Sequence, residues 1–349
     1  IRLTEDTAAA VPDAIDPRHR LRLVLSRWTG YAPLVVAKYN GYLDSESMRV
    51  DFLQVDDHVT HERLLASGEV DVIGTSLPTL LGYWVKGIPL TVILPLDRTT
   101  GTEGIVVRPD SSINTMLDLR QQRVAVDKGG ILQFVLFQAL EDAGLSLSDV
   151  QLESLPASQV ARDIGNGTLE IGLTREPFLS TLLANEQARV IYTSEDQGGL
   201  LLDLLAVTPT AATQKATVIL ALVEGVLKAQ QFIVQNPDRA TEIMANWEAQ
   251  PIEVTRSNLA KLTFFDDQAT REFFFGDRLA EVLATFEMYF DTIEQPFPLV
   301  THEDIVNMNF FKHIMDQAKS EDMTSEAVSS SLKSATGRTT SFPSETVTS

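Results

Sequence analysis

Residues 63–72 read RLLASGEVDV, and residues 162–171 read RDIGNGTLEI. Each segment has the pattern of a helix that ends at a glycine and is followed by an apolar strand. Each then continues to a threonine and a proline, at positions 75 and 78 in the first copy and 174 and 177 in the second, so the offset stays at 99 residues. A repeat of this kind indicates a duplicated structural unit. The sequence therefore predicts two similar lobes.

Strands and helices alternate around both copies of the repeat. The expected strands of the first half are 21–25, 50–55, 70–74 and 90–96, and its expected helices are 32–40, 58–66 and 78–85. The strand and helix at 23–43 have counterparts at 124–145 in the second half. Short connections between alternating strands and helices are typical of a mostly parallel sheet covered by helices. The predicted fold class is α/β with two lobes, each a mixed, mostly parallel sheet flanked by helices.

The last third of the chain reads as one strand followed by helices. The strand is expected at 202–207, and the helices at 213–235, 238–246, 252–261, 269–293 and 302–318. These helices are expected to pack back on the first lobe. The predicted domains are a lead at 1–19, a discontinuous first lobe at 20–103 plus 205–318, a second lobe at 104–204, and a disordered Ser/Thr-rich tail at 319–349.

The composition narrows the classes of protein to consider. A net charge of −20 and a pI near 4.6 disfavour binding to nucleic acid or to anionic lipid surfaces. The chain has no cysteine, which excludes thiol chemistry, disulfides and thiolate metal sites. No apolar run approaches the roughly 20 residues needed to cross a bilayer, so we expect a soluble chain, and we also expect it to be a monomer. The abrupt start at Ile1 is interpreted as a processed or trimmed product.

Several short motifs occur in the order found in one known family. They are APLVVAK at 32–38, GYL at 41–43, LASGEVDV at 65–72, DLR at 118–120 before RVAV at 123–126, and QNP at 235–237. Over residues 20–315 the chain resembles type 2 periplasmic binding proteins of the nitrate, taurine and aliphatic-sulfonate branch, which are related to thiamine-precursor-binding proteins. The resemblance implies a ligand in the cleft between the lobes, no cofactor, and delivery of a small polar solute to an ABC permease and ATPase. It also implies a periplasmic or extracytoplasmic location, with or without a membrane anchor in the precursor.

A finer resemblance concerns the ligand. Trp28, the loop 97–104 and the segment GGLLLDLLAVTP at 198–209 are similar to binding proteins encoded beside urea-carboxylase or guanidine-utilisation enzymes. Many members of the broader branch have Trp-x-Pro where this chain has Arg175-Glu176-Pro177. This departure puts a sulfonate ligand in doubt.

The repeat predicts where the site lies. In open α/β sheets, ligands bind at the carboxyl ends of strands, where helix N-termini present free N–H groups. The loops 26–31, 75–79, 127–131 and 174–177 should therefore form the walls of the cleft. The candidate ligand-binding residues are Arg27, Trp28, Tyr31, Ser76, Thr79, Asp97, Thr99, Glu103, Gly129, Gly130, Arg175, Glu176 and Asp203.

Most of these candidates also have an ordinary structural interpretation. Trp28 could stack on a planar or cationic ligand, or it could pack between the lobes. Ser76 and Thr79 could bind the ligand or cap a helix. Gly129 and Gly130 could bring backbone N–H groups close to a ligand, although no P-loop motif follows them.

The sign of the ligand's charge stays open at this level. Asp97, Glu103 and Asp203 fall in segments expected to line the cleft, and they would favour a cation. The basic residues of the same loops, Arg27, Arg98 and Lys128, could instead bind an anion through charge-assisted hydrogen bonds. Adjacent Arg175 and Glu176 could reach the ligand or pair with each other as a weak surface ion pair.

Enzymatic functions have little support in the sequence. His58 and His61 with Glu62 have the spacing of a solvated helix face, and no third metal ligand is evident. No Gly-x-Ser-x-Gly elbow occurs, and a thiamine-precursor-synthesising relative would need a catalytic cysteine that this chain lacks. We therefore expect a binding protein and no enzyme. The competing hypothesis is a sensor domain of the same fold, fused through the Ser/Thr-rich tail to a membrane signalling protein.

Overall fold

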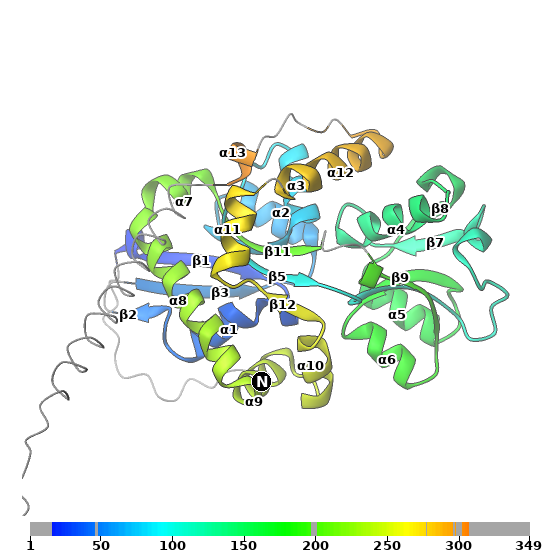
Figure 1. Ribbon diagram of the computed structural model, residues 1–349, viewed down its shortest axis with the longest axis horizontal. Helices are drawn as coiled ribbons and strands as arrows, with labels where there is room; N and C mark the ends of the chain where they lie inside the picture. Colours follow the sequence, from blue (N-terminus) through cyan, green and yellow to red (C-terminus); the bar gives the residue numbers. More distant parts are fainter. Residues whose placement is uncertain are drawn as a thin grey trace, which may run out of the picture. The chain divides into compact units, whose positions relative to one another are not determined.

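Two β-sheets, each flanked by helices, make up the fold in the computed structural model (Figure 1). The structure describes residues 16–45, 48–196, 201–276, 278–295, 297 and 302–306. Most of the predicted lead and all of the predicted tail lie outside these residues. All described residues belong to one compact unit.

The first sheet has seven strands in the order β12-β5-β11-β4-β1-β3-β2. Their bounds are β1 Arg20–Leu25, β2 Asp44–Ser45, β3 Met48–Gln54, β4 Val72–Ser76, β5 Thr91–Thr99, β11 Leu202–Val207 and β12 Leu262–Phe264. Strand β1 pairs in parallel with both β3 and β4. Strand β11 runs antiparallel between β4 and β5. The sheet is therefore mixed, with a parallel centre, and the sequence did not predict its edge strands β2 and β12.

The second sheet has five strands in the order β10-β6-β9-β7-β8. Their bounds are β6 Glu103–Val107, β7 Arg123–Val126, β8 Gln151–Ser154, β9 Ile171–Arg175 and β10 Arg189–Thr193. Strand β7 pairs in parallel with β8 and β9, and β6 is antiparallel to β9 and β10. Strands β4 and β9 correspond residue for residue at the offset of 99. The internal repeat is thus a repeat of structure as well as of sequence.

The helices of the two halves also correspond. In the first half they are α1 Ala32–Tyr39, α2 His58–Ala66 and α3 Leu77–Val85, and in the second α4 Ile131–Asp142, α5 Ala157–Gly165 and α6 Phe178–Ala184. Helices α2 and α5 end before Gly68 and Gly167, whose φ angles of 70° and 80° suit glycine and let the chain turn into the next strand. Figure 1 shows α1 and α2 on opposite faces of the first sheet. The α/β fold class predicted from the sequence is confirmed.

The remaining helices follow β11. They are α7 Pro209–Gln214, α8 Ala216–Gln235, α9 Pro237–Glu248, α10 Ile252–Leu259, α11 Asp267–Phe275, α12 Arg278–Thr292 and α13 His302–Ile305. Short 3₁₀ turns occur at η1 Pro17–His19, η2 Thr29–Tyr31, η3 Met116–Leu119, η4 Leu147–Asp149 and η5 Ser194–Asp196. The prediction of a single helix at 269–293 is wrong. The helix ends at Phe275, before Gly276, and glycine weakens a helix. The helix expected at 302–318 is described only as far as α13.

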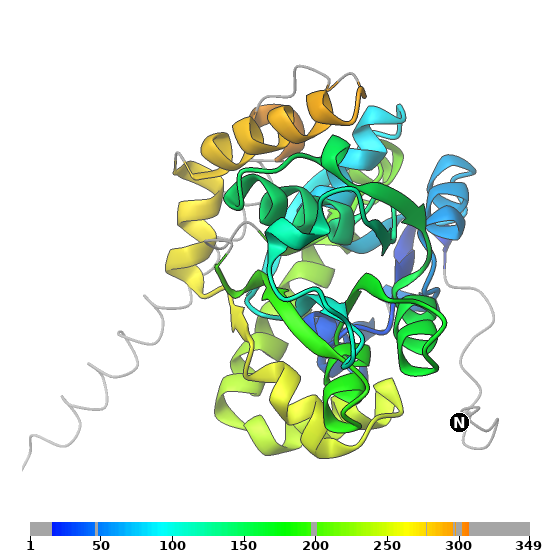
Figure 2. The ribbon, with the colours of Figure 1, turned by 90° about the vertical axis from the view of Figure 1, so that its right-hand side faces the viewer.

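Helix α12 packs on a helix of the second sheet. The rings of Phe286 and Phe134 have their centroids 4.3 Å apart, and Tyr289 contacts the same Phe134 edge-on at 5.4 Å. Phe134 belongs to α4, which lies beside α12 in both ribbon views (Figures 1 and 2). Helix α12 therefore contacts the second half through buried aromatic side chains, whereas its segment was expected to pack on the first lobe.

Helix α8 is long and apolar enough, by length and composition alone, to cross a membrane. This differs from the expectation that no apolar run reaches such a length. However, 50% of its most apolar window is buried, and it packs against α1 over the first sheet. Core helices of globular proteins pass the same test.

The chain crosses between the two sheets at two places. It leaves the first sheet at the end of β5 and enters β6 at Glu103, and it returns from β10 to β11. Strands β5 and β11 are paired, so the outgoing and returning segments lie side by side where they join the first sheet. Polar residues near these crossings, far apart in sequence, are thereby brought together.

Candidate functional site

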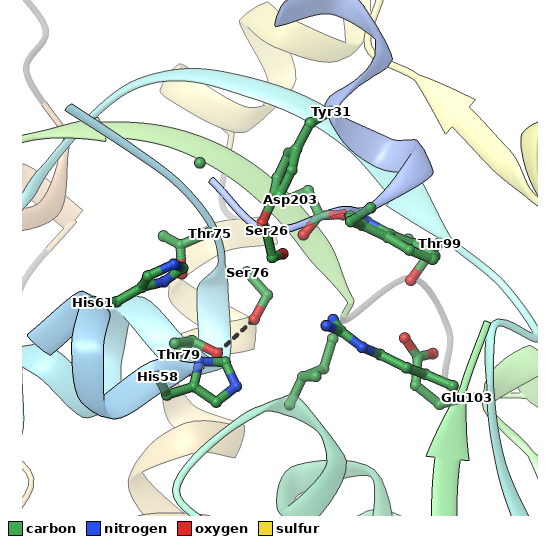
Figure 3. A pocket seen from close by; sticks show the side chains of 14 residues that line it. Ser26, Tyr31, His58, His61, Thr75, Ser76, Thr79, Thr99, Glu103 and Asp203 are labelled. Atoms are coloured by element: carbon green, nitrogen blue, oxygen red, sulfur yellow. Dashed lines mark hydrogen bonds between the residues drawn. The ribbon is translucent and has the colours of Figure 1, made fainter. Parts of the chain in front are cut away.

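A pocket lies where strands of both sheets end and helices begin (Figure 3). The residues that line it are Ser26, Trp28, Tyr31, His58, His61, Gly74, Thr75, Ser76, Thr79, Thr99, Glu103, Ile131, Arg175 and Asp203. All four loops expected to form the cleft walls contribute to this lining. The space for the centres of water-sized molecules is about 30 Å³, and one ordered water needs roughly 10–15 Å³ on that measure. The pocket is therefore suited to a molecule of few heavy atoms.

Equivalent strands of the two halves each end at the pocket. Strand β4 ends at Ser76 and β9 ends at Arg175, which are the same position in the repeat. The hydroxyl groups of Ser76 and Thr79 are hydrogen-bonded at 2.9 Å, as the dashed line in Figure 3 shows. One half thus offers hydroxyl groups to the pocket, and the other offers a guanidinium.

Three carboxyl groups meet beside the crossing strands. Asp97 on β5 lies directly opposite Asp203 on β11, and Glu103 begins β6. The residues are 0%, 4% and 2% exposed, respectively. Burial raises the pKa of all three carboxyl groups: well above the usual value for Asp97, to about 7 for Asp203, and above the ordinary value for Glu103. The acids expected near the cleft are therefore brought together, with Glu103 and Asp203 in the pocket wall and Asp97 directly behind it.

Two aromatic residues of the loop after β1 complete this wall. The indole N–H of Trp28 donates a hydrogen bond of 2.5 Å to Oδ2 of Asp203. Tyr31 lies over Gly74, where an added Cβ would come within 3.2 Å of the tyrosine ring. Both aromatic side chains are buried, at 5% exposure. Trp28 therefore does pack within the protein, and it also positions a carboxylate in the pocket.

The interpretation of His58 and His61 as a solvated helix face is wrong. Both line the pocket, His61 is only 5% exposed, and its Nε2 lies 2.8 Å from the carbonyl oxygen of Val55. Figure 3 shows the two rings on the opposite side of the pocket from Glu103. Burial lowers the pKa of both histidines, to about 4 for His58, and the charge of Arg175 acts in the same direction. Both rings are therefore neutral at pH 7.

Some of the candidate residues lie outside the pocket. Arg27 points to the surface, where the Nε and Nη2 groups of its guanidinium both donate hydrogen bonds to Oδ2 of Asp56. Gly129 and Gly130 form the turn before α4 and are not among the residues that line the pocket. An added Cβ on Gly130 would come within 3.0 Å of the His58 ring. The sequence pattern located their loops correctly, but it contained no information on which way each residue faces.

Glu176 has a partner from the other sheet. Its buried carboxylate accepts a hydrogen bond of 2.5 Å from the ammonium of Lys261, and it also accepts from the backbone N–H and hydroxyl of Ser180. Lys261 directly precedes β12, whereas Glu176 directly follows β9. This ion pair therefore joins an edge strand of the first sheet to the end of a strand that reaches the pocket.

Replacing Lys261 with methionine is expected to lower the free energy of unfolding by about 1–3 kcal/mol, because the buried carboxylate of Glu176 would lose its cation. The matched control is Lys86→Met, which breaks an ion pair with Glu62 in which the lysine side chain is 49% exposed. That change should cost less than about 1 kcal/mol. Denaturant unfolding of both variants measures the difference, and equal losses would contradict a special role for the Lys261 pair.

Other pocket residues were not predicted, namely Ser26, Gly74, Thr75 and Ile131. Ser26, Thr75 and Ile131 fall within the loops expected to form the walls, so the strand-end rule could have found them. Gly74 could not have been found in this way, because its role depends on the ring of Tyr31 above it. Among the described residues, no group of three or more His, Cys, Asp or Glu side chains is placed to hold a metal ion.

Comparison with protein families and curated proteins gives consistent results. A family model described as NMT1/THI5 like matches residues 28–240. A protein of Haemophilus influenzae named for thiamine biosynthesis is 22% identical over 234 residues, which are 66% of this chain and 73% of that protein. The taurine-binding periplasmic protein of Escherichia coli is 25% identical over 239 residues, 67% of this chain and 71% of that protein.

Solved structures share the fold. The alkanesulfonate-binding protein SsuA from Xanthomonas axonopodis pv. citri, bound to MOPS, superposes with a TM-score of 0.71 at 18% sequence identity. The match covers 84% of this chain and 100% of that one. At this level of identity the likeness establishes the periplasmic-binding-protein fold, and the fold predicted from the sequence is confirmed.

Proposed function

Because the chain belongs to the NMT1/THI5-like family, we propose that it is an extracytoplasmic solute-binding protein that captures a small polar molecule and delivers it to an ABC importer. The protein acts by binding, without chemical turnover. Its partners are the solute and the permease and ATPase of the importer, and it works as a monomer that does not bind nucleic acid. The finer resemblance to the urea-carboxylase-associated subgroup stays a prediction.

One observation carries this proposal: the pocket takes equivalent residues from both halves of a repeat. Ser76 and Arg175 end corresponding strands of different sheets and line the same pocket. A solute that contacts both would stabilise the arrangement in which the two halves are close, which is how hinge closure couples to binding. The relatives named for taurine and alkanesulfonate binding support the same function.

The proposal also accounts for the polar character of the pocket. Hydroxyl groups of Ser26, Thr75 and Thr99 line it together with charged groups, and the free space is small. A few convergent polar groups in a small cavity are typical of sites that recognise one small solute. A periplasmic location follows from the same function.

Trp28 should report binding through its fluorescence, because its indole lies in the pocket wall and is hydrogen-bonded to Asp203. Titration with the bound solute is expected to change the emission of the native protein and of Trp84→Phe. The indole of Trp84 donates to the carbonyl oxygen of Leu90 and is not part of the pocket lining. Trp28→Phe should lose the change.

The same experiment can reject the proposal. The solute is recovered after prolonged incubation and analysed by mass spectrometry, and it should be unchanged. Chemical conversion would identify an enzyme, and a response that survives in Trp28→Phe but disappears in Trp84→Phe would place the solute elsewhere.

A further inference from the structure

The carboxyl groups at the pocket do not have enough partners. Glu103 accepts hydrogen bonds from the hydroxyl groups of Thr102 and Ser194, at 2.8 and 2.6 Å. Asp203 accepts one from the indole of Trp28. Asp97 is 0% exposed, and neither of its carboxylate oxygens has a hydrogen-bond partner. An unpartnered buried polar group is costly, so Asp97 points to a group that is bound there in use.

Asp97 and Asp203 converge on one place. If Gly30 carried a Cβ, that atom would lie 2.6 Å from Oδ2 of Asp203, 2.8 Å from Oδ2 of Asp97 and 2.4 Å from the indole nitrogen of Trp28. Only glycine leaves room at this position. The two carboxylates therefore face a common point next to Gly30, directly behind the part of the pocket wall that Asp203 forms.

Positive charge near the pair is scarce. No Lys, Arg or His nitrogen in the described part of the chain lies within ion-pair distance of the Asp97 or Asp203 carboxylate. Arg175 is the one permanently charged cation among the lining residues, and it lies opposite Glu103 in the pairing of β6 with β9. The charge of Arg175 lowers the pKa of both Glu103 and Asp203, so one guanidinium serves two of these buried carboxyl groups and does not compensate all three.

We infer that the solute is a small cation with several N–H donors, held by the carboxylates of Asp97 and Asp203; this rests on the proposed function of the same pocket. A guanidinium or amidinium group fits this chemistry, because its planar fork of N–H donors matches carboxylate oxygens. The small free space favours a molecule of about that size. An anion would instead add negative charge beside three acidic side chains, which is unfavourable.

Binding of a cation should release protons. The pKa of Asp203 is raised to about 7 and that of Asp97 is raised well above its usual value, in both cases mainly by burial. A cation stabilises the ionised carboxylates, so it binds more tightly as pH rises through this range. The other titratable or charged groups that face the pair are Glu103, Arg175 and Tyr31. His58 and His61 lie farther along the pocket, and burial lowers the pKa of both, so the two rings are neutral at pH 7 and above and do not reverse the trend there.

Three planar probes of similar size and different charge test the inference: guanidinium, urea and nitrate, with ethanesulfonate as a second anion. Isothermal titration calorimetry of the full chain at pH 6, 7 and 8 compares them. Guanidinium should bind at least about 100-fold more tightly than urea or either anion. Its affinity should rise with pH by up to about tenfold per unit, the slope expected when one proton is released.

The outcomes separate this inference from the proposed function. If nitrate, ethanesulfonate or urea binds more tightly than guanidinium, or if affinity for guanidinium falls as pH rises, the inference of a cationic solute is wrong. The proposed solute-binding function then still stands. If none of the four probes binds, the inferred cation is overturned, and the Trp28 fluorescence titration decides the proposed function separately. Asp203→Asn offers a second readout, because it should weaken guanidinium binding and flatten the pH slope, whereas binding elsewhere would leave both unchanged.

Discussion

Replacing Asp97 with asparagine is expected to weaken guanidinium binding by at least about 100-fold while the protein stays folded. The carboxylate is fully buried and has no partner within the described chain, so no internal hydrogen bond is lost. The loss falls on the solute, because removing one member of a buried charge pair costs about 2–5 kcal/mol of binding free energy. Calorimetry at pH 8, where the native protein should bind best, measures the change.

The same variant should become more stable than the native protein as pH rises. The folded-state pKa of Asp97 lies above its ordinary value, so the folded protein holds a proton that the unfolded chain has released. Between those two pKa values the free energy of unfolding therefore falls as pH increases. Asparagine carries no such proton, and the gap in melting temperature between variant and native protein should widen from pH 5 to pH 8.

Asp71→Asn is the matched control, since Asp71 is also a buried acid but lies just before β4, at the opposite end of that strand from Ser76. Its carboxylate is bonded to Arg22 and Lys215. This variant should lose stability and keep its affinity for guanidinium. If instead Asp97→Asn is the one that melts earlier and binds normally, Asp97 is a structural acid and the cation site is rejected.

Replacing Phe286 with alanine is expected to lower the free energy of unfolding by about 3–5 kcal/mol. Phe286 is fully buried, and its ring packs on Phe134 of α4 with centroids 4.3 Å apart. Truncation leaves a cavity between α12 and the helix that covers the second sheet. Denaturant unfolding followed by circular dichroism gives the loss.

Phe275→Ala is the control for this prediction, because the same change of side chain at a residue 55% exposed should cost much less. A loss below about 1 kcal/mol for Phe286→Ala would contradict the packing of α12 on α4. The result also bears on closure of the pocket. If α12 is held to α4, the two halves move with this helix attached to the second, and the variant should alter the affinity for the solute as well as the stability.

The sequence was most informative where a pattern is local and repeated. The offset of 99 residues predicted corresponding elements, and α2 with β4 does correspond to α5 with β9. Glycine after each helix required a positive φ, which is a property of single residues. Local patterns were less reliable at 269–293, where the helical period of the sequence continues across Gly276 although one helix ends there and another begins.

Sequence alone also identified Asp97, Glu103 and Asp203 as residues that could decide the sign of the ligand's charge. It could not show that Asp97 and Asp203 lie opposite each other. That depends on the pairing of β5 with β11, two strands of the first sheet that precede and follow the second half in the sequence. The same limit explains why Arg27 lies outside the pocket lining and why His58 and His61 lie within it. Whether a polar side chain faces water or the pocket depends on neighbours that are distant in sequence.

The unpartnered state of Asp97 could be seen only in the tertiary structure. A hydrogen-bond partner can come from any part of the chain, so a missing partner is established only when all neighbours in space are known. The sequence by itself determined the duplicated α/β fold and the loops that end at the pocket, because those follow from local periodicity and turn residues. The tertiary structure decided which charges are compensated, because electrostatic balance depends on distance in space and on burial.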